Sequence, residues 1–422
     1  MDKFLIWGGN RLKGEVNISG CKNSVLPIIT AAMLADSPSR IKRIPWLKDV
    51  DTMILILEAL GVKIKRSFDG DAIIDPAEII SWEAPYDLVR KMRSSIYVLG
   101  ALLGRVGKAV VSMPGGCVIG PRPIDLHVKG LTQLGAKIIT RHGYIIAEAV
   151  KLKGREMFLS GTFGSSVGAT VNVLLAAVKA EGTTIIEGAA CEPDVVDLIE
   201  FLKKMGAKIE GAGSPTIKIK GVKSLHGAEH TVMPDRIEAG TYMMAAAITG
   251  GNLLLRNVNA PMLESVIDKM RQTGATVTPK GDTISVKVTK KLKPADITTL
   301  PYPGFPTDLQ AQFMAVMSIT DGASVIVEKI YPDRFMHVGE LTRLGANIKM
   351  DNGSAIVKGV KKLSGAPVMA SDLRASAALV LAGLVAEGET TVNRVYHIDR
   401  GYEEIEEKLS KIGAQIKRVK SN

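Results

Sequence analysis

The segment from Pro114 to His127, PGGCVIGPRPIDLH, places one cysteine among three glycines and three prolines. This composition predicts a loop, and its flexibility is typical of a lid over a site. Arg122 follows Cys117 closely, and a nearby cation favours the thiolate form of a cysteine. We therefore expect Cys117 to act as a nucleophile or a proton donor. An incidental exposed thiol is the alternative.

Arginine or lysine recurs where helices are predicted to begin. The positions are Lys22, Arg93, Arg122, Arg236, Arg334, Arg374 and Arg400. A helix N-terminus carries partial positive charge and disfavours cations. Because cations recur there in several helices, we expect these N-termini to share an anion such as phosphate. Several of the cations follow an aspartate, so local salt bridges and aspartate caps are the alternative.

The stretch from Tyr302 to Gln310, YPGFPTDLQ, is a third candidate site. Asp308 could be a general base if a substrate hydroxyl came within hydrogen-bond reach. Thr307 or Asp308 could equally cap the helix that follows.

A short phrase of the type Leu-Gly-Ala-Lys-Ile recurs six times and divides nearly the whole chain into repeats. Its glycines are Gly61, Gly135, Gly206, Gly274, Gly345 and Gly413. Each phrase follows an amphipathic helical stretch and precedes a β-rich run, so each glycine is predicted to be the C′ cap of a helix.

A second, more apolar helix is expected upstream of each amphipathic one. These helices are predicted at 22–35, 93–103, 166–180, 237–249, 307–320 and 373–386. Each repeat is therefore predicted to run strand, helix, strand, helix, strand, strand. A period near 70 residues is longer than that of common solenoids, so closed domains of three repeats are favoured, with a boundary before Pro234.

The composition excludes several classes of protein. The 422 residues include 54 Lys and Arg and 43 Asp and Glu, a net charge of +11, with 46% hydrophobic residues, which excludes wholesale disorder and allows two domains. The basic residues are scattered and do not alternate with aromatic ones, so no nucleic-acid partner is expected. Neither a nucleotide-binding glycine motif nor a metal-ligand pattern occurs, so ATP hydrolysis and zinc chemistry are not expected. The few cysteines, the lack of a signal-like start and the short apolar stretches predict a cytoplasmic protein without membrane insertion.

Several segments together carry a specific resemblance. They are SGCKN from Ser19, the cysteine loop, FPTDLQAQF, RFMHVGEL, DLRASAALVLAG and YHIDRGYEEIEEKL. From Met1 to about Val419 the chain closely resembles the enolpyruvyl transferase family, and within it the branch that acts on UDP-N-acetylglucosamine. The cysteine loop distinguishes this branch, because the branch that acts on shikimate 3-phosphate shares the six repeats but lacks the loop.

The resemblance implies a fold and an activity. The fold would be α/β, with two inside-out α/β barrel domains of three βαβαββ repeats each and an active-site cleft between them. The first domain would span 22–233, and the second would combine 1–21 with 234–422. The reaction would move the enolpyruvyl group of phosphoenolpyruvate to the 3′-hydroxyl of UDP-N-acetylglucosamine and release phosphate, without any cofactor. This is the first committed step of peptidoglycan biosynthesis, which serves cell-wall biogenesis, cell shape and cell division.

The resemblance also implies roles for particular residues. Cys117 would donate a proton to the methylene of phosphoenolpyruvate, could form a covalent adduct with it, and would be the thiol that fosfomycin alkylates. Asp308 would take the proton from the attacking hydroxyl, and the phosphate and carboxylate of phosphoenolpyruvate would be held by Lys22, Arg122 and Arg400. The UDP-N-acetylglucosamine site would be lined by Asn23, Arg93, Arg122, Pro123, Ile124, Asp125, Leu126, Ser166, Val167, Gly168, Asp308 and Ile330. The cationic cleft would be completed by Arg334, Asp372 and Arg374.

One segment departs from the family pattern. Where some members carry a lysine two residues before the Ser-Val-Gly-Ala-Thr run, this chain has Gly161 to Ser165, GTFGS, leading into Ser166. The segment offers no cation to the nucleotide, and backbone N–H groups are the alternative contacts.

Three other functions stay open from the residues. The same chemistry on another acceptor, such as shikimate 3-phosphate, is opposed by the cysteine loop. A nucleic-acid-binding protein would show a steep dependence of binding on salt. A thiol hydrolase would pair Cys117 with His127 and need no phosphoenolpyruvate.

Overall fold

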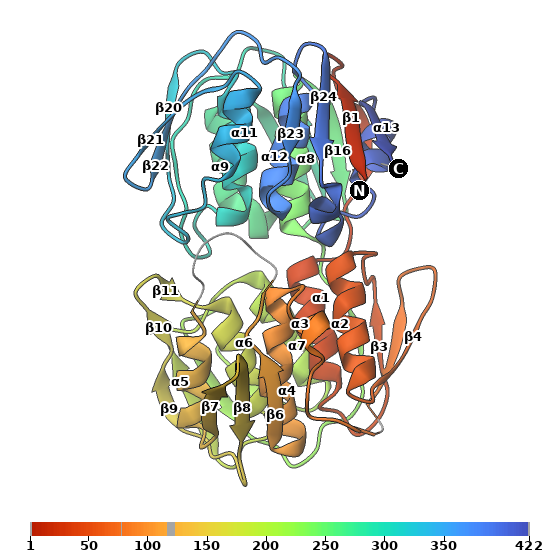
Figure 1. Ribbon diagram of the computed structural model, residues 1–422, viewed down its shortest axis with the longest axis vertical. Coiled ribbons are helices and arrows are strands. Elements are labelled where there is room, and N and C mark those ends of the chain that lie inside the picture. Colours follow the sequence, from red (N-terminus) through yellow and green to blue (C-terminus); the bar gives the residue numbers. More distant parts are fainter. Residues whose placement is uncertain (1, 77, 116–122, 421–422) are drawn as a thin grey trace. The chain divides into compact units, whose positions relative to one another are not determined.

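The structure is a computed structural model that describes every residue except 1, 77, 116–122 and 421–422. The described chain divides into two compact units (Figure 1). One, here called the 20–233 unit, extends from Gly20 to Met233. The other, here called the C-terminal unit, contains the chain up to Ser19 and from Pro234 onward.

Helices of the 20–233 unit pack against one another beneath its sheets. They are α1 (Lys22–Ala32), α2 (Lys48–Ala59), α3 (Tyr86–Val89), η1 (Arg93–Ile96), α4 (Tyr97–Val106), α5 (Asp125–Gln133), α6 (Val167–Ala177) and α7 (Pro193–Lys204). Three sheets have the strand orders β15-β3-β5-β4, β6-β8-β7 and β13-β14-β12-β9, and β10 pairs with β11. Their strands are β3 (Ser39–Lys42), β4 (Lys63–Arg66), β5 (Ala72–Asp75), β6 (Lys108–Ser112), β7 (Lys137–Arg141), β8 (Tyr144–Glu148), β9 (Glu156–Phe158), β10 (Ser160–Gly161), β11 (Gly164–Ser165), β12 (Thr183–Glu187), β13 (Lys208–Glu210), β14 (Thr216–Lys220) and β15 (Glu229–Thr231).

The C-terminal unit has the same plan. Its helices are α8 (Arg236–Ile248), η2 (Ala260–Leu263), α9 (Glu264–Gln272), η3 (Thr307–Leu309), α10 (Gln310–Met317), α11 (His337–Arg343), α12 (Leu373–Gly383), η4 (Val395–Arg400) and α13 (Ile405–Lys411). Its sheets have the orders β17-β18-β16-β2, β19-β20-β22-β21 and β23-β24-β1-β25. Their strands are β1 (Lys3–Trp7), β2 (Lys13–Asn17), β16 (Asn252–Arg256), β17 (Thr276–Lys280), β18 (Thr283–Lys287), β19 (Ile297–Thr298), β20 (Ala323–Val327), β21 (Asn347–Asp351), β22 (Ser354–Lys358), β23 (Pro367–Met369), β24 (Glu389–Asn393) and β25 (Gln415–Val419).

The predicted repeat is confirmed by the order of the elements. In one repeat the chain runs β19, α10, β20, α11, β21, β22, with β19 parallel and β22 antiparallel to β20. Strands that are distant in the sequence complete a sheet in each unit, because β2 pairs in parallel with β16 in the C-terminal unit and β15 pairs in parallel with β3 in the 20–233 unit. The α/β fold of repeated βαβαββ units follows.

The six recurring glycines end helices, as predicted. Their φ angles lie between +91° and +107°, and they follow α2, α5, α7, α9, α11 and α13. Any residue with a Cβ atom is strained in this left-handed conformation, so glycine is the residue that lets the helix turn into the next strand.

The more apolar helix of each repeat forms the core. In α8, every residue from Ile237 to Ile248 is buried, and α6, α10 and α12 are similarly enclosed. Helices α4 and α6 pack closely, since a Cβ atom at Gly100 would lie 2.2 Å from the backbone oxygen of Asn172. The strands instead alternate buried and accessible residues, which leaves one face of each sheet to solvent.

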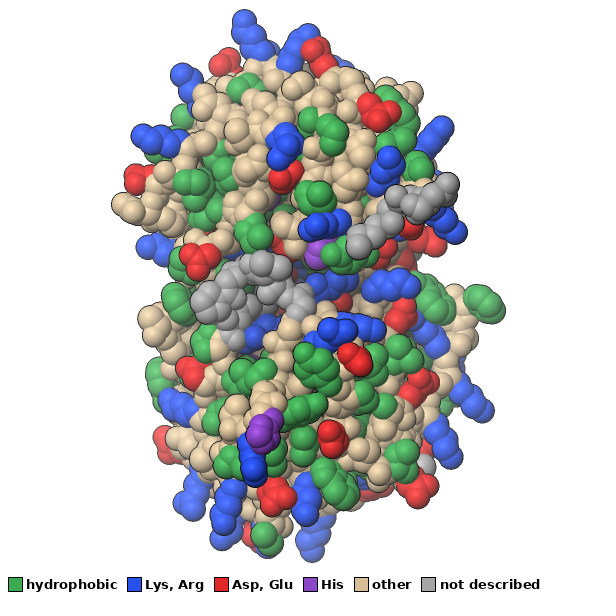
Figure 2. All heavy atoms as spheres, in the orientation of Figure 1, with side chains coloured by type: hydrophobic (Ala, Val, Ile, Leu, Met, Phe, Trp, Pro, Cys, Tyr) green, Lys and Arg blue, Asp and Glu red, His purple; other side chains and the backbone are tan. Residues whose placement is uncertain are grey.

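Charged side chains are distributed over the surface without a single-sign patch in the view of Figure 2, where Lys and Arg stand among Asp and Glu. Of the described helices, none combines the length and hydropathy that crossing a bilayer would need.

Candidate active site

In the C-terminal unit, two arginines share one carboxylate. Arg334 Nη1 lies 2.8 Å from Asp308 Oδ1, and Arg374 Nη2 lies 3.0 Å from Asp308 Oδ2. The side chain of Asp308 is 26% exposed, whereas those of Arg334 and Arg374 are 8% and 3% exposed. The fold therefore presents an accessible carboxylate that is backed by two nearly enclosed cations.

The two arginines determine the charge of Asp308. Burial by itself raises the pKa of a carboxyl group, but Arg374 and Arg334 outweigh burial and hold the pKa of Asp308 well below its usual value. Asp308 is ionised at neutral pH, yet a carboxylate held in this way is a weak base. Since neither η3 nor α10 has a side-chain cap, the alternative that Thr307 or Asp308 caps the helix is wrong.

Asp372 positions the helix that carries Arg374. It is the N-cap of α12, and its Oδ1 accepts hydrogen bonds from the backbone N–H groups of Arg374 and Ala375. The cap directs the first turn of α12 and its arginine toward Asp308. The alternative that these aspartates cap helices is thus confirmed for Asp372. It is also confirmed for Asp235, which is the N-cap of α8.

A layer of polar residues behind this cluster was not predicted. Gln312 Nε2 donates to the backbone oxygen of Asp308 at 2.9 Å and contacts the hydroxyl of Tyr402 at 3.1 Å. Tyr402 in turn lies 2.8 Å from Thr241 Oγ1, and its ring lies 5.4 Å from the guanidinium of Arg374. The only sequence signal was that polar residues interrupt otherwise apolar helices.

His337 is a further buried residue near the cluster. Burial lowers its pKa to about 4, an effect that Arg334 reinforces and Asp372 opposes. The imidazole is therefore neutral at physiological pH.

Ile330 lies in the turn after β20. Its backbone N–H donates to Glu328 Oε1 at 2.8 Å. The same glutamate accepts a hydrogen bond from Thr307, the neighbour of Asp308. The structure thus connects Ile330 with the Asp308 cluster through a residue that the sequence did not single out.

In the 20–233 unit, α1 begins with two predicted site residues. Lys22 is the first residue of the helix and Asn23 is the second. Lys22 Nζ lies 2.7 Å from Asp49 Oδ2, and both side chains are largely buried. The lysine is therefore held in place by a carboxylate from the first turn of α2.

Arg93 and the start of α5 form a second group in this unit. Arg93 begins η1, and its Nη2 donates to the backbone oxygen of Pro123 at 3.1 Å. Ile124 is the N-cap of α5, and Asp125 and Leu126 form its first turn. The remaining predicted residues of the loop, Cys117 and Arg122, lie outside the described residues.

The first turn of α6 contains the third group. Ser166 is the N-cap and accepts a hydrogen bond from the backbone N–H of Ala169, and Val167 and Gly168 follow it. The departing segment before it forms the hairpin of β10 and β11, in which Gly161 pairs with Gly164.

His127 is a buried residue of α5. It is 4% exposed, and its Nδ1 lies 2.8 Å from Nδ2 of Asn172. Because Cys117 lies outside the described residues, the alternative of a thiol hydrolase that pairs it with His127 is not tested by this contact.

The predicted positions of cations at helix starts are partly wrong. The prediction is confirmed for the first or second residues of four helices: Lys22, Arg93, Arg236 and Arg374. Arg334 lies in a turn before α11, and Arg400 is the last residue of η4. Arg334 is instead placed by its carboxylate partner, because buried cations require one.

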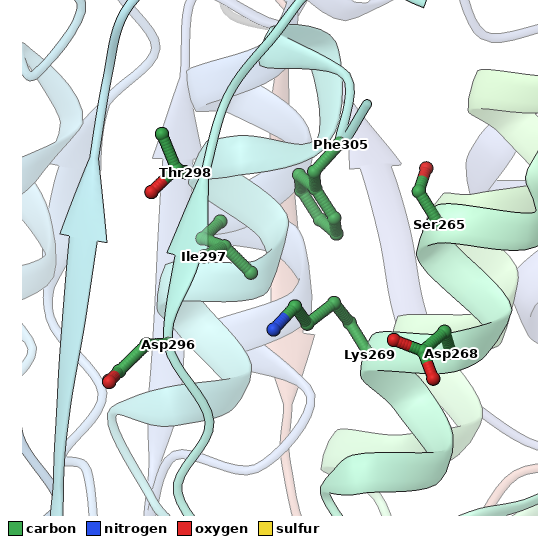
Figure 3. A pocket seen from close by; sticks show the side chains of 7 residues that line it. All are labelled: Ser265, Asp268, Lys269, Asp296, Ile297, Thr298 and Phe305. Atoms are coloured by element: carbon green, nitrogen blue, oxygen red, sulfur yellow. The ribbon is translucent and has the colours of Figure 1, made fainter. Parts of the chain in front are cut away.

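A pocket on the C-terminal unit lies apart from these residues (Figure 3). In Figure 3, Lys269 extends from α9 toward Ile297, and Phe305 lines the same hollow. The described lining consists of Ser265, Asp268, Lys269, Asp296, Ile297, Thr298 and Phe305. None of these residues was predicted to bind substrate.

Comparison with known proteins agrees with this fold. A family model described as EPSP synthase (3-phosphoshikimate 1-carboxyvinyltransferase) matches residues 6–409. The chain therefore belongs to this family of enolpyruvyl transferases, and the predicted enzyme class is confirmed.

Individual relatives indicate a particular branch of the family. Two relatives are named UDP-N-acetylglucosamine 1-carboxyvinyltransferase, and each is 53% identical to this chain. The match to the protein from Methylacidiphilum infernorum covers 100% of both chains. The match to the protein from Geotalea uraniireducens covers 99% of this chain and 100% of the relative. The resemblance found in the sequence is thus confirmed.

Solved structures share the fold. The enolpyruvyl transferase NikO from Streptomyces tendae has a TM-score of 0.91 at 28% identity, covering 100% of this chain and 99% of NikO. An EPSP synthase from Acinetobacter baumannii has a TM-score of 0.77 at 20% identity over the whole of both chains, a likeness of fold alone.

Proposed function

We propose that this protein transfers the enolpyruvyl group of phosphoenolpyruvate to the 3′-hydroxyl of UDP-N-acetylglucosamine and releases phosphate. The observation that carries the proposal is the 53% identity, over the full chain, to relatives that are named for this reaction. The protein would then catalyse the first committed step of peptidoglycan biosynthesis and serve cell shape and division in the cytoplasm. Its partners would be these two small molecules, not nucleic acid.

The reaction needs an acid, a base and fixed cations. The acceptor oxygen bonds to C2 of phosphoenolpyruvate while the methylene carbon gains a proton. Phosphate then leaves as the C–O bond to it breaks, and the new methyl group loses a proton to restore the double bond. The intermediate carries a carboxylate and a phosphate together, so preorganised cations stabilise it.

The arginines beside Asp308 suit this task. Arg334 and Arg374 are nearly enclosed, and a cation acts more strongly on an anion where water is excluded. A substrate carboxylate that bound them would compete with Asp308 for the same guanidinium groups. Once released, Asp308 would have a higher pKa and could accept the proton of the attacking hydroxyl.

The groups of the 20–233 unit suit the phosphorylated substrates. Lys22 begins α1, and a helix N-terminus with a lysine favours an anion. The first turn of α6, with Ser166 as its cap, offers further N–H groups to a diphosphate. Arg93, Pro123 and the first turn of α5 would line the nucleotide, and Arg122 and Arg400 would join Lys22 at phosphoenolpyruvate.

Cys117 would supply the proton to the methylene carbon, as the family resemblance implies. A thiol in this role also explains the expected alkylation by fosfomycin, because an epoxide is opened by a thiolate.

The decisive experiment measures phosphate release from phosphoenolpyruvate with each of two acceptors. We expect rapid release with UDP-N-acetylglucosamine and little with shikimate 3-phosphate. The opposite preference would assign the protein to the other branch of the family, and release with neither would refute the proposal.

A further inference from the structure

Glu328 is a buried carboxylate that the proposed reaction does not use. It follows β20 directly and is 2% exposed. Its Oε1 accepts hydrogen bonds from Thr299 Oγ1 at 2.6 Å and from the backbone N–H groups of Ile330 and Tyr331 at 2.8 and 3.0 Å. Its Oε2 accepts one from Thr307 Oγ1 at 2.8 Å. Four donors compensate the removal of the carboxylate from water.

The contact with Thr307 continues to the Asp308 cluster. Arg334 Nη1 donates to Thr307 Oγ1 at 3.0 Å, and the same nitrogen lies 2.8 Å from Asp308 Oδ1. A threonine hydroxyl has one hydrogen, and a carboxylate can only accept. Glu328 therefore takes that hydrogen and leaves the oxygen of Thr307 as an acceptor for Arg334.

The carboxylate of Glu328 thus supports two parts of the proposed site, Arg334 and the turn at Ile330. Through the hydroxyl of Thr307 it orients the guanidinium of Arg334. Through two backbone N–H groups it fixes the turn that carries Ile330. One of these parts would contact phosphoenolpyruvate and the other UDP-N-acetylglucosamine.

We infer that Glu328 is a positioning residue, which acts through Thr307 to hold Arg334 against Asp308 and so places the cation for phosphoenolpyruvate beside the base for the acceptor hydroxyl. The inference rests on the proposed function, since Arg334 and Asp308 have their roles only in that reaction. A purely structural role, in which Glu328 only closes its own turn, is the competing explanation.

Two threonines of the same network provide a matched comparison. The hydroxyl of Thr299 donates to Glu328 and accepts from the backbone N–H of Lys329 at 2.9 Å. The hydroxyl of Thr307 donates to Glu328 and accepts from Arg334. Valine at either position removes two hydrogen bonds, one of which is donated to the carboxylate of Glu328. Only Thr307→Val also breaks the connection to Arg334.

The experiment measures kcat and KM of Thr307→Val, Thr299→Val, Thr307→Ser and the unmodified chain. We expect Thr307→Val to raise KM for phosphoenolpyruvate at least about tenfold, because a hydrogen bond to a charged group is lost. Thr299→Val should stay within about threefold of the unmodified chain, although thermal melting shows a comparable loss of stability. Thr307→Ser restores the hydroxyl and should recover the unmodified KM.

Glu328→Gln gives a second, independent variant. Its amide cannot accept at both positions, so a donor faces either Thr307 or the backbone N–H groups. We expect its KM for phosphoenolpyruvate to rise as in Thr307→Val. Equal kinetic effects of the two valine variants, or an unchanged KM in Thr307→Val, would overturn the inference.

Crystal structures of the two valine variants separate this inference from the proposed function. If the unmodified chain releases no phosphate with UDP-N-acetylglucosamine, the proposed function fails and the structures decide the positioning role. Displacement of Arg334 from Asp308 in Thr307→Val alone would support it. An unmoved Arg334 in Thr307→Val would refute it.

Discussion

Arg374 Nη2 lies 3.0 Å from Asp308 Oδ2, although 66 positions of sequence separate the two residues. The aspartate belongs to η3 and the arginine to the first turn of α12, so the contact joins two successive repeats. Arg334 occupies the other carboxylate oxygen. Removal of this carboxylate would leave two enclosed cations facing each other, which makes Asp308 both a structural and a chemical centre.

Asp308→Asn is expected to lower kcat at least ~10²-fold, because an amide cannot accept the proton of the attacking hydroxyl. Steady-state phosphate release at saturating substrates measures the effect, and circular dichroism verifies the fold. Asp333→Asn, at an exposed acid near the same cluster, is the control and should retain full activity. An unchanged kcat in Asp308→Asn would reduce Asp308 to a counter-ion for the arginines.

Cys117→Ala is expected to abolish turnover with the fold intact, because the proposed acid is removed. Fosfomycin should add once to the unmodified chain and not to this variant, as intact-protein mass spectrometry would show. Cys191→Ala, which removes a half-buried thiol, should behave like the unmodified chain. Full phosphate release by Cys117→Ala would contradict the assigned role.

His337 is expected to make stability decline as the solution becomes acidic. Burial lowers its pKa to about 4 in the folded chain, whereas the unfolded chain binds the proton near its usual value of about 6.5. Stability is therefore complete above about pH 6.5 and falls as the pH is lowered toward 4, by about 2 kcal/mol between pH 7.5 and 5.

Chemical denaturation of the unmodified chain and of His337→Gln at these two pH values tests this expectation. The glutamine variant should lack this part of the pH dependence, while all other groups titrate equally in both chains. Identical pH dependence of the two chains would show that His337 does not titrate in this range.

Asn172→Ala is expected to destabilise the 20–233 unit by at least about 2 kcal/mol, because it leaves buried polar groups without partners. Its Oδ1 accepts from the backbone N–H of Gly100, and its Nδ2 contacts the backbone oxygen of Ile96 and Nδ1 of His127. Urea denaturation measures the loss. Asn10→Ala, which removes one exposed hydrogen bond to Gly413, should cost less than about 1 kcal/mol; equal losses would refute the account.

Local rules allowed the repeat to be predicted from the sequence. Glycines such as Gly206 end helices because a left-handed residue is needed there, and apolar stretches such as that of α8 form core helices. These features depend on neighbours in the chain, so their patterns identify them. The sequence also singled out Asp308, Arg334 and Arg374 as candidates, and the family resemblance then implied their roles.

Contacts between distant residues could not be predicted in this way. The prediction that Arg334 and Arg400 begin helices was wrong, because sequence spacing does not reveal which turn a chain takes before a helix. Glu328 was missed because an acid at the end of a strand usually faces water. Its burial depends on the fold, which places the hydroxyl groups of Thr299 and Thr307 within hydrogen-bond distance of its carboxylate.

The amino-acid sequence by itself thus determined the six repeats, their helix ends and the family of the enzyme. Only the tertiary structure decided that Asp308 is shared by two arginines and that Glu328 supports them through Thr307. The physical reason is that helix ends and apolar faces follow from interactions within a few residues. The partner of a buried charge is selected by the packing of separate repeats, which places the donors that a desolvated carboxylate requires.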